Sequence, residues 1–530
     1  MPTNGFNKRV PLLKGALLLV LVAGVVAGGN CAEATNHVLE LFIKKGMLTR
    51  EEVDRAVAED QAMSTNQNVM PESASKWKIS NAIKDIELFG DLRLRFEHRQ
   101  ANVPDGGRIE LDRARYALRL GLRGDAFDDF YYGLRLETSS NPRSPWDTFG
   151  TSSSGIPYNG PDGKSTAGIN LGQIYLGWRP TSWMDLTVGK MPNPLYTTPM
   201  VWDSDLNPEG AAERFKYTVG EADFFLTFGQ FIYADVNPSY ASGGLGFNGL
   251  LGQANDTPFQ IAWQGGVNYH FTTNVSAKIA STLYTYIGLQ TNVSPFFGDP
   301  FVGEGAFTGP GTAYPINGAS GYGTSSGLIG NGSLGYPNNQ VGLNHLLILE
   351  IPAEVNFKIS SFDARVFGDF AYNLEGSERA EEAAAGYANY LASQSLGGPV
   401  SVQPFSPQRN DVMAYQAGFA IGSKDALGLV YGQTSQRHAW EFRAYWQHIE
   451  QYALDPNLLD SDFFEGRGNL EGIYLALAYG FTGNVIGTVR YGNAWRINDK
   501  IGTGGSNQDI PQVNPIDHYN LLQLDMTLRF

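Results

Sequence analysis

The most constraining feature of the sequence is a stretch at residues 111–124 with two chemically different faces. From Ala114 to Leu122 every second residue is apolar, and four of the six alternate residues from 113 to 123 are arginine. Alternation with a period of two is typical of a β-strand, in which successive side chains point to opposite faces. The pattern also occurs over 88–99 and 132–137. Such strands fit either a half-buried soluble sheet or a transmembrane β-barrel with a wet lumen.

Composition favours the barrel. Charged residues make up 17% of the 530 residues, against roughly 25% in ordinary soluble proteins. Glycine (63 residues) and aromatic residues (12%) are abundant, which suits the long loops and aromatic girdles of a membrane barrel. Beyond the N-terminus no run approaches the roughly 18 apolar residues that a spanning helix needs. The formal net charge of −15 argues against nucleic acid as a partner.

Residues 1–34 are predicted to be a secretory signal peptide. Three basic residues precede an apolar core at 16–27, and Ala32-Glu33-Ala34 is a small-residue cleavage site. The alternative is a lipoprotein site at Cys31, but Asn30 stands where a small residue is expected. Cleavage after Ala34 removes the single cysteine, so the mature chain would have no thiol for disulfides or metal binding.

The mature chain is predicted to have two parts. Residues 35–80 form a short periplasmic helical segment and a polar linker, because 37–63 has helical apolar spacing and 49–52 is a capping box. Residues 81–530 form an all-β, antiparallel transmembrane barrel of about 16 strands. Its short turns and long loops alternate, which an even-stranded barrel with both termini in the periplasm requires. Residues 100–110 are predicted to be one of the long loops, and the loop at 375–411 is predicted to contain a short helix at 377–385. The weakest connection is 424–438, where the flanking strands are expected to extend further.

The last nine residues form one more amphipathic strand that ends at Phe530. We expect this strand to pair with the first one, because an unpaired strand edge is unfavourable in lipid. A terminal phenylalanine also resembles the signal that the bacterial barrel-assembly machinery reads, so that machinery is a predicted partner.

The inward faces of the first three strands carry a large excess of arginine. Eight arginines face three carboxylates there, an excess of five positive charges. All of the eight except Arg99 are predicted to line the pore: Arg93, Arg95, Arg113, Arg115, Arg119, Arg123 and Arg135. Such a wall would focus the field on a water column. The alternative is that these arginines only keep the lumen wet and pair locally with carboxylates.

The connection over 191–210 is the most unusual one. Pro192 and Pro194 cannot donate to a strand ladder, and three carboxylates then follow in a turn-forming context: Asp203, Asp205 and Glu209. The functional interpretation is a loop that folds back into the barrel, narrows it and sets these carboxylates opposite the arginines. The alternative is an ordinary surface loop.

Several of these motifs resemble the outer-membrane "putative porin" family of Gram-negative bacteria. The similar features are the Arg113-Ala114-Arg115 strand, Met191-Pro192-Asn193-Pro194, residues 201–210, Asp460-Ser461-Asp462-Phe463 and the terminal Phe530. The resemblance covers most of the mature chain. It implies a sixteen-stranded porin that assembles as a homotrimer in the outer membrane.

The predicted function is therefore passive diffusion of small hydrophilic solutes and ions. None of the seven histidines stands at metal-ligand spacing, and we expect no enzyme activity, no cofactor and no metal. The alternative is a barrel that encloses a partner periplasmic protein such as a cytochrome. Any haem would have to come from that partner, because the chain has no C-x-x-C-H motif.

The signal-peptide interpretation predicts that the exported protein begins at Thr35. N-terminal sequencing or intact mass of the purified outer-membrane form measures this directly. A lipid-modified Cys31 at the N-terminus would contradict it.

Overall fold

The structure is a computed structural model. It describes residues 83–102, 106–139, 144–150, 168–233, 259–287, 345–394, 406–434, 436–504, 510 and 515–530. These residues belong to one compact unit, Asn81–Phe530. The predicted signal peptide and the predicted helical segment at 35–80 lie outside the described residues.

The described residues form a single antiparallel sheet of 17 strands. The strands are β1 (Glu87–Asn102), β2 (Arg108–Asp125), β3 (Phe130–Thr138), β4 (Asp147–Thr148), β5 (Ile169–Thr181), β6 (Met184–Lys190), β7 (Glu209–Val219), β8 (Ala222–Ile232), β9 (Phe259–Thr272), β10 (Val275–Ile287), β11 (Leu347–Ile359), β12 (Phe362–Asn373), β13 (Met413–Ser423), β14 (Trp440–Ile449), β15 (Leu470–Gly480), β16 (Val485–Arg496) and β17 (His518–Arg529). Because β4 has only two residues and extends β3 along β2, sixteen long strands remain, and the predicted fold class is confirmed.

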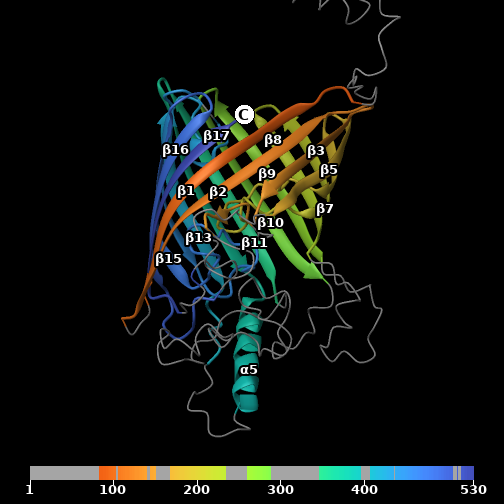
Figure 1. The fold of residues 1–530 in the computed structure, drawn as a ribbon. Coiled ribbons are helices and arrows are strands. Elements are labelled where there is room, and N and C mark those ends of the chain that lie inside the picture. Colours follow the sequence, from red (N-terminus) through yellow and green to blue (C-terminus); the bar gives the residue numbers. More distant parts are fainter. Residues whose placement is uncertain are drawn as a thin grey trace, which may run out of the picture. The chain divides into compact units, whose positions relative to one another are not determined.

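The sheet closes on itself. Each long strand pairs with the next along the chain, and β1 pairs with both β2 and β17. Figure 1 shows β1 and β17 side by side, although they lie at opposite ends of the barrel sequence. The backbone of Phe530 completes the seam by exchanging hydrogen bonds of 2.8 and 3.0 Å with Gly90. A β-carbon at Gly90 would lie 2.8 Å from the Phe530 ring, so the last residue packs where a side chain is missing.

The two faces of the wall are the reverse of those in a soluble protein. On β1, Leu94 is 45% exposed whereas its neighbour Arg95 is 4% exposed. On β17, Leu524 and Leu528 are exposed whereas Gln523 is fully buried. The exposed outer face is therefore apolar and the buried inner face is polar, as in a barrel that meets lipid outside.

Two connections differ from those predicted. The connection after β1 is shorter than expected, because β1 continues to Asn102 and β2 begins at Arg108. The strands do not extend into 424–438, which instead contains a 3₁₀ turn, η6 (Leu429–Tyr431). The carboxylate of Glu441 accepts the amides of Gly428 and Val430, each at 2.9 Å. Leu429 and Val430 of this turn are buried, although the turn belongs to no strand.

The predicted helix within the β12–β13 connection is present and is longer than expected. It is α5 (Gly376–Gln394), at the end of the barrel opposite the C-terminus (Figure 1). No helix among the described residues combines the length and the apolar character needed to cross a bilayer.

The closing strand provides a test of the fold. Replacing Leu524 and Leu528 with aspartate places charge on the outer face, where charged residues cost up to roughly 2–4 kcal/mol per central site, and aspartate somewhat less. We expect the double variant to lose the heat-modifiable gel mobility of a folded barrel and to fail to accumulate in membranes.

Asn520→Asp is the matched control for this double variant. It lies on the same strand, and its side-chain oxygen already accepts a hydrogen bond of 2.7 Å from Asn493. The new carboxylate can accept the same bond, so this variant should assemble. Normal assembly of the Leu524→Asp/Leu528→Asp variant would contradict the closing role of β17.

Candidate functional site

The 191–208 segment begins at a bend in the wall between β6 and β7. Gly189 and Gly210 face each other across this strand pair, with φ angles of +117° and +149°. A β-carbon at Gly189 would lie 2.3 Å from a carbonyl oxygen of β5, so only glycine fits there. The amide of Met191 donates to the carbonyl of Pro208 at 2.9 Å and closes the base of the segment. The following residues leave the sheet.

The first part of the segment is hydrogen-bonded to the wall formed by β9, β11 and β12. Its partners there are Gln264 on β9 for Tyr196, Glu350 on β11 for Thr197, and Asp369 on β12 for Thr198. The backbone of Tyr196 exchanges two hydrogen bonds of 2.9 Å with the Gln264 amide. Both threonine hydroxyls donate to carboxylates that are buried in the barrel. This part of the segment therefore supplies donors that buried acids need.

The second part of the segment contacts other strands. Arg119 on β2 donates to Asp205 at 2.5 Å. Trp202 packs edge-on against Phe231 of β8, with ring centroids 5.9 Å apart. In the order of the closed sheet, β2 is half-way round from β11 and β12. The 191–208 segment thus contacts strands that are about half the closed sheet apart.

The β14–β15 connection, residues 450–469, is hydrogen-bonded to this segment. The amide of Asp203 donates to the carbonyl of Leu458 at 2.7 Å, and the amide of Asp460 donates back to a carbonyl of the segment at 3.3 Å. Ser461 donates to the Asp203 carboxyl through its amide and its hydroxyl, each at 3.3 Å. The two connections therefore form one hydrogen-bonded unit.

The carboxyl groups in this unit differ in charge state. Burial, with the negative charges of Asp460 and Asp205, raises the pKa of Asp203 well above its usual range. Burial and the charge of Asp462 raise the pKa of Asp460 to about 7. Burial also opposes ionisation of Asp462, but the neighbouring arginines, Arg95 first among them, outweigh it and lower the pKa of that group. The surroundings therefore favour the protonated form of Asp203 and the ionised form of Asp462.

Each arginine predicted to line the pore has a carboxylate partner. The ion pairs are Arg93 with Asp91, Arg95 with Asp462 and Asp525, Arg113 and Arg115 with Glu97, Arg119 with Asp205, Arg123 with Glu87, and Arg135 with Glu137. Three of these acids, Asp205, Asp462 and Asp525, come from parts of the chain far from the first three strands. Tertiary contacts therefore offset much of the positive excess that the three strands show by themselves.

The three carboxylates predicted on the loop separate in the structure. Asp203 is buried and accepts the amide of Asp205 at 2.9 Å. Asp205 pairs with Arg119 of the inner wall. Glu209 is the first residue of β7, is exposed, and pairs with Lys190 at 2.7 Å. Only Asp205 contacts one of the arginines predicted for the wall.

Four residues that the sequence patterns did not single out complete this region. The Trp146 ring lies 4.1 Å from the Arg95 guanidinium, and Arg443 on β14 lies 4.7 Å from the Tyr431 ring of η6. Arg490 on β16 donates to the carbonyl of Val430 at 2.8 Å. The period-two rule could have identified Arg443 and Arg490, because both alternate with apolar residues. The two aromatic residues lie in connections without periodicity.

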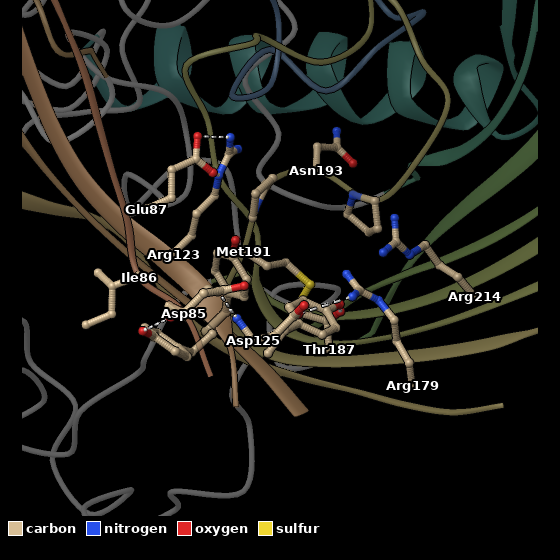
Figure 2. Close-up of a pocket in the computed structure, with 16 residues that line it drawn as sticks. Asp85, Ile86, Glu87, Arg123, Asp125, Arg179, Thr187, Met191, Asn193 and Arg214 are labelled. Carbon is tan, nitrogen blue, oxygen red and sulfur yellow. Dashed lines mark hydrogen bonds and ion pairs between the residues drawn. The ribbon is translucent and has the colours of Figure 1, made fainter. Parts of the chain in front are cut away.

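Two cavities lie beside the 191–208 segment. The first, of about 570 Å³, is lined by residues of the segment, of the β14–β15 connection and of the inner wall. The second, of about 600 Å³, contains Arg123, Arg179 and Arg214, which come from β2, β5 and β7 (Figure 2). Asn193 lines both cavities. Within the described part of the chain, no group of three or more His, Cys, Asp or Glu residues could hold a metal ion.

Two solved outer-membrane proteins are similar to this chain. An anion-selective porin from Comamonas acidovorans shares 7% identity over 84% of this chain and 99% of that one, with a TM-score of 0.39. The outer-membrane protein OmpT of Vibrio cholerae shares 8% identity over 86% of this chain and 100% of that one, with a TM-score of 0.37. At such low TM-scores the fold rests on the strand pairing and not on these likenesses. No curated protein matches the sequence.

A sequence family described as "Putative porin" matches residues 102–530. The matched region includes β2 to β17 and both non-strand segments of the site. Because the match spans well over half of the chain, the protein belongs to the "Putative porin" family.

Proposed function

We propose that the protein is an outer-membrane porin through which small hydrophilic solutes and ions diffuse passively, with residues 191–208 folded into the lumen as a constriction. The observation that carries this proposal is that the segment contacts β2 as well as β9, β11 and β12 within one closed sheet. A segment outside the barrel could not reach strands from opposite sides of the sheet. The buried state of Met191, Met200 and Trp202 supports the same arrangement.

The charges beside the segment suit a selective pathway. Arg93 and Arg119 stand on the β1–β2 wall, and Asp205 reaches them from the segment. Opposed charged groups at a narrow point set up a transverse field, in which a polar solute can exchange hydration for contacts with the wall. Arginine suits this wall because its guanidinium stays protonated and tolerates partial desolvation. The acidic partner is Asp205, since it pairs with Arg119, whereas Asp203 is buried and pairs with no arginine among the described residues.

The structure gives less support to a barrel that encloses a cytochrome-like partner. Side chains of the protein itself occupy the interior beside the segment: Leu454, Leu459, Phe463 and Phe464 of the β14–β15 connection are buried in the same apolar cluster as Met200 and Trp202. Such packing leaves cavities of small-molecule size. Cleavage of the signal peptide, recognition by the barrel-assembly machinery and assembly as a homotrimer remain parts of the proposal.

Ion selectivity tests the charged constriction. Asp205→Asn should leave Arg119 without its short ion pair and shift the reversal potential in a KCl gradient towards anions. Arg93→Gln/Arg119→Gln should shift it towards cations. Both shifts should shrink near 1 M salt, where the screening length is only about 3 Å. Planar-bilayer recordings of each variant measure the reversal potential.

Glu381→Gln is the matched control, because it removes one negative charge from the exposed helix α5, which lines neither cavity. It should leave the selectivity unchanged at pH 7. If the charge-changing variants also keep the wild-type reversal potential at low salt, Arg93, Arg119 and Asp205 do not border the conducting path.

The contact between the two connections should depend on pH. The folded protein holds a proton on Asp460 up to about pH 7, whereas an unfolded aspartate releases it near pH 4. Folded protein thus binds more protons in this window, so this group's contribution to stability falls as the pH rises from about 4 to 7. The temperature at which gel mobility changes should be more sensitive to pH in the wild type than in Asp460→Asn.

Glu381→Gln, in the exposed helix α5, serves as the control for this pH comparison. It should show the wild-type pH dependence. A wild type and an Asp460→Asn variant with the same dependence between pH 5 and 8 would contradict the assignment.

A further inference from the structure

The two cavities are neighbours that share one lining residue of the 191–208 segment. The first is lined from Asn193 to Asp205 along the segment, and the second is lined by residues 191–194. Asn193 is the one residue that lines both. Asn193 therefore lies at the boundary that the two cavities share, and Figure 2 shows it among the residues that line the second cavity, together with Arg123 and Arg214.

The first cavity combines guanidinium groups that have unused donors with aromatic faces. Arg93 donates through Nε and Nη2 to Asp91, and Arg443 donates through Nε and Nη2 to Glu441. Arg365 engages Asn356 through Nε and Glu354 through Nη1. In the described residues, nothing binds the remaining guanidinium nitrogen of these three arginines. A carboxylate that enters the cavity could therefore accept hydrogen bonds from these guanidinium nitrogens.

The aromatic faces of the first cavity are close to the same arginines. The Arg443 guanidinium lies 4.7 Å from the Tyr431 ring centroid and 5.0 Å from that of Phe367. Tyr445 and Tyr474 also line the cavity, but both are buried and stack on each other at 4.7 Å, so the accessible ring surface is that of the half-buried Tyr431 and Phe367. Flat side chains of this kind favour a flat solute, because stacking supplies the contact area that water would lose.

The charge of the first cavity favours an anion. Six arginines line it, against five carboxyl groups. Two of the five, Asp203 and Asp460, lack a cationic partner within the described structure and have raised pKa values caused first by burial. The balance at neutral pH is therefore positive.

The second cavity repeats this combination. Arg179 lies 4.0 Å from the Tyr131 ring centroid, and its nearest carboxylates are at 3.6 and 3.7 Å, which are ion pairs longer than hydrogen bonds. Tyr175 packs edge-on against Tyr131 at 6.2 Å. Arg179 is half-exposed, so its guanidinium can reach a solute in the cavity.

We propose that the two cavities are successive binding sites for planar organic carboxylates, that is, acids whose carboxylate is attached to a ring. The carboxylate binds the unused donor of Arg93, Arg365 or Arg443 in the first cavity while the ring packs against Tyr431 and Phe367. It then passes Asn193 and binds Arg179 in the second. Guanidinium donors suit this transfer because the remaining nitrogen of each arginine can donate a charge-assisted hydrogen bond to a carboxylate oxygen while the other two nitrogens stay paired with the wall. The inference rests on the proposed porin function and names its solute class.

Benzoate is the probe for this inference. In planar bilayers with KCl, we expect benzoate to reduce the wild-type current in a saturable way. Benzamide, which has the ring without the charge, and acetate, which has the charge without the ring, should have much smaller effects at equal concentration. Arg443→Gln should weaken half-maximal block by about tenfold, the scale expected for one charge-assisted hydrogen bond. Arg443→Lys should restore only part of it, because lysine keeps the charge but lacks the planar fork.

Asn193→Trp tests the passage between the cavities. It should slow benzoate permeation, measured as a bi-ionic current or as vesicle swelling, more than it lowers the KCl conductance. Arg409→Gln is the matched control, since Arg409 lines neither cavity and pairs with Glu381 on the exposed helix α5. KCl conductance and heat-modifiable mobility establish that each variant is folded and inserted.

The outcomes separate this inference from the proposed function. A wild type without KCl conductance would contradict the porin itself. A conducting wild type in which benzoate blocks no better than acetate would overturn the planar-carboxylate sites alone. Block by a neutral sugar such as maltose without block by benzoate would also overturn them, since the lining would then be selecting hydroxyl groups instead of a carboxylate.

Discussion

The pairing of β1 with β17 is the constraint on which the rest of the structure depends. In lipid a backbone amide or carbonyl without a partner costs several kcal/mol, so a spanning sheet must have no edge. The seam is twelve residue pairs long, from Asp91↔Arg529 to Asn102↔His518, and is extended by Phe530 on Gly90. Once the sheet is closed, the period of two in each strand assigns every side chain to lipid or to the interior. The apolar residues of one face become the outer surface, and the arginines of the other face are enclosed.

Enclosing so many charged groups creates the second problem that the structure solves. A charge without a partner is costly in a partly dry interior, and a buried pair is tolerated only when its hydrogen bonds are also satisfied. The inner wall meets this requirement by bringing carboxylates from distant parts of the chain. Asp525 on the last strand and Asp462 on the β14–β15 connection both reach Arg95 on the first strand. The connections that enter this network are thereby fixed in place.

The 191–208 segment is held at the opposite wall for the same reason, namely that buried polar groups need partners. Glu350 and Asp369 are buried carboxylates without a cationic partner within the described residues, and the hydroxyls of Thr197 and Thr198 donate to them. Their need for donors holds the segment against β11 and β12, while Arg119 holds its other end. The two cavities lie beside this segment, and the residues that line them account for the proposed selectivity. Stability and the proposed selectivity would therefore depend on the same ion pairs and hydrogen bonds.

By itself the sequence determined the barrel, its closing strand, its inward arginines and the place where the wall is interrupted. These features are local, because strand periodicity, proline and glycine positions and the parity of Arg93 to Arg135 are read within a few residues. The tertiary structure alone decided which carboxylate meets which arginine, that Asp203 is buried while Asp205 is not, and that Trp146 and Tyr431 enter the site. Parity determines the face of a residue but not its partner. Partners in the interior are chosen by the path of connections that have no period, and hydrogen-bond and charge satisfaction across hundreds of residues determines that path.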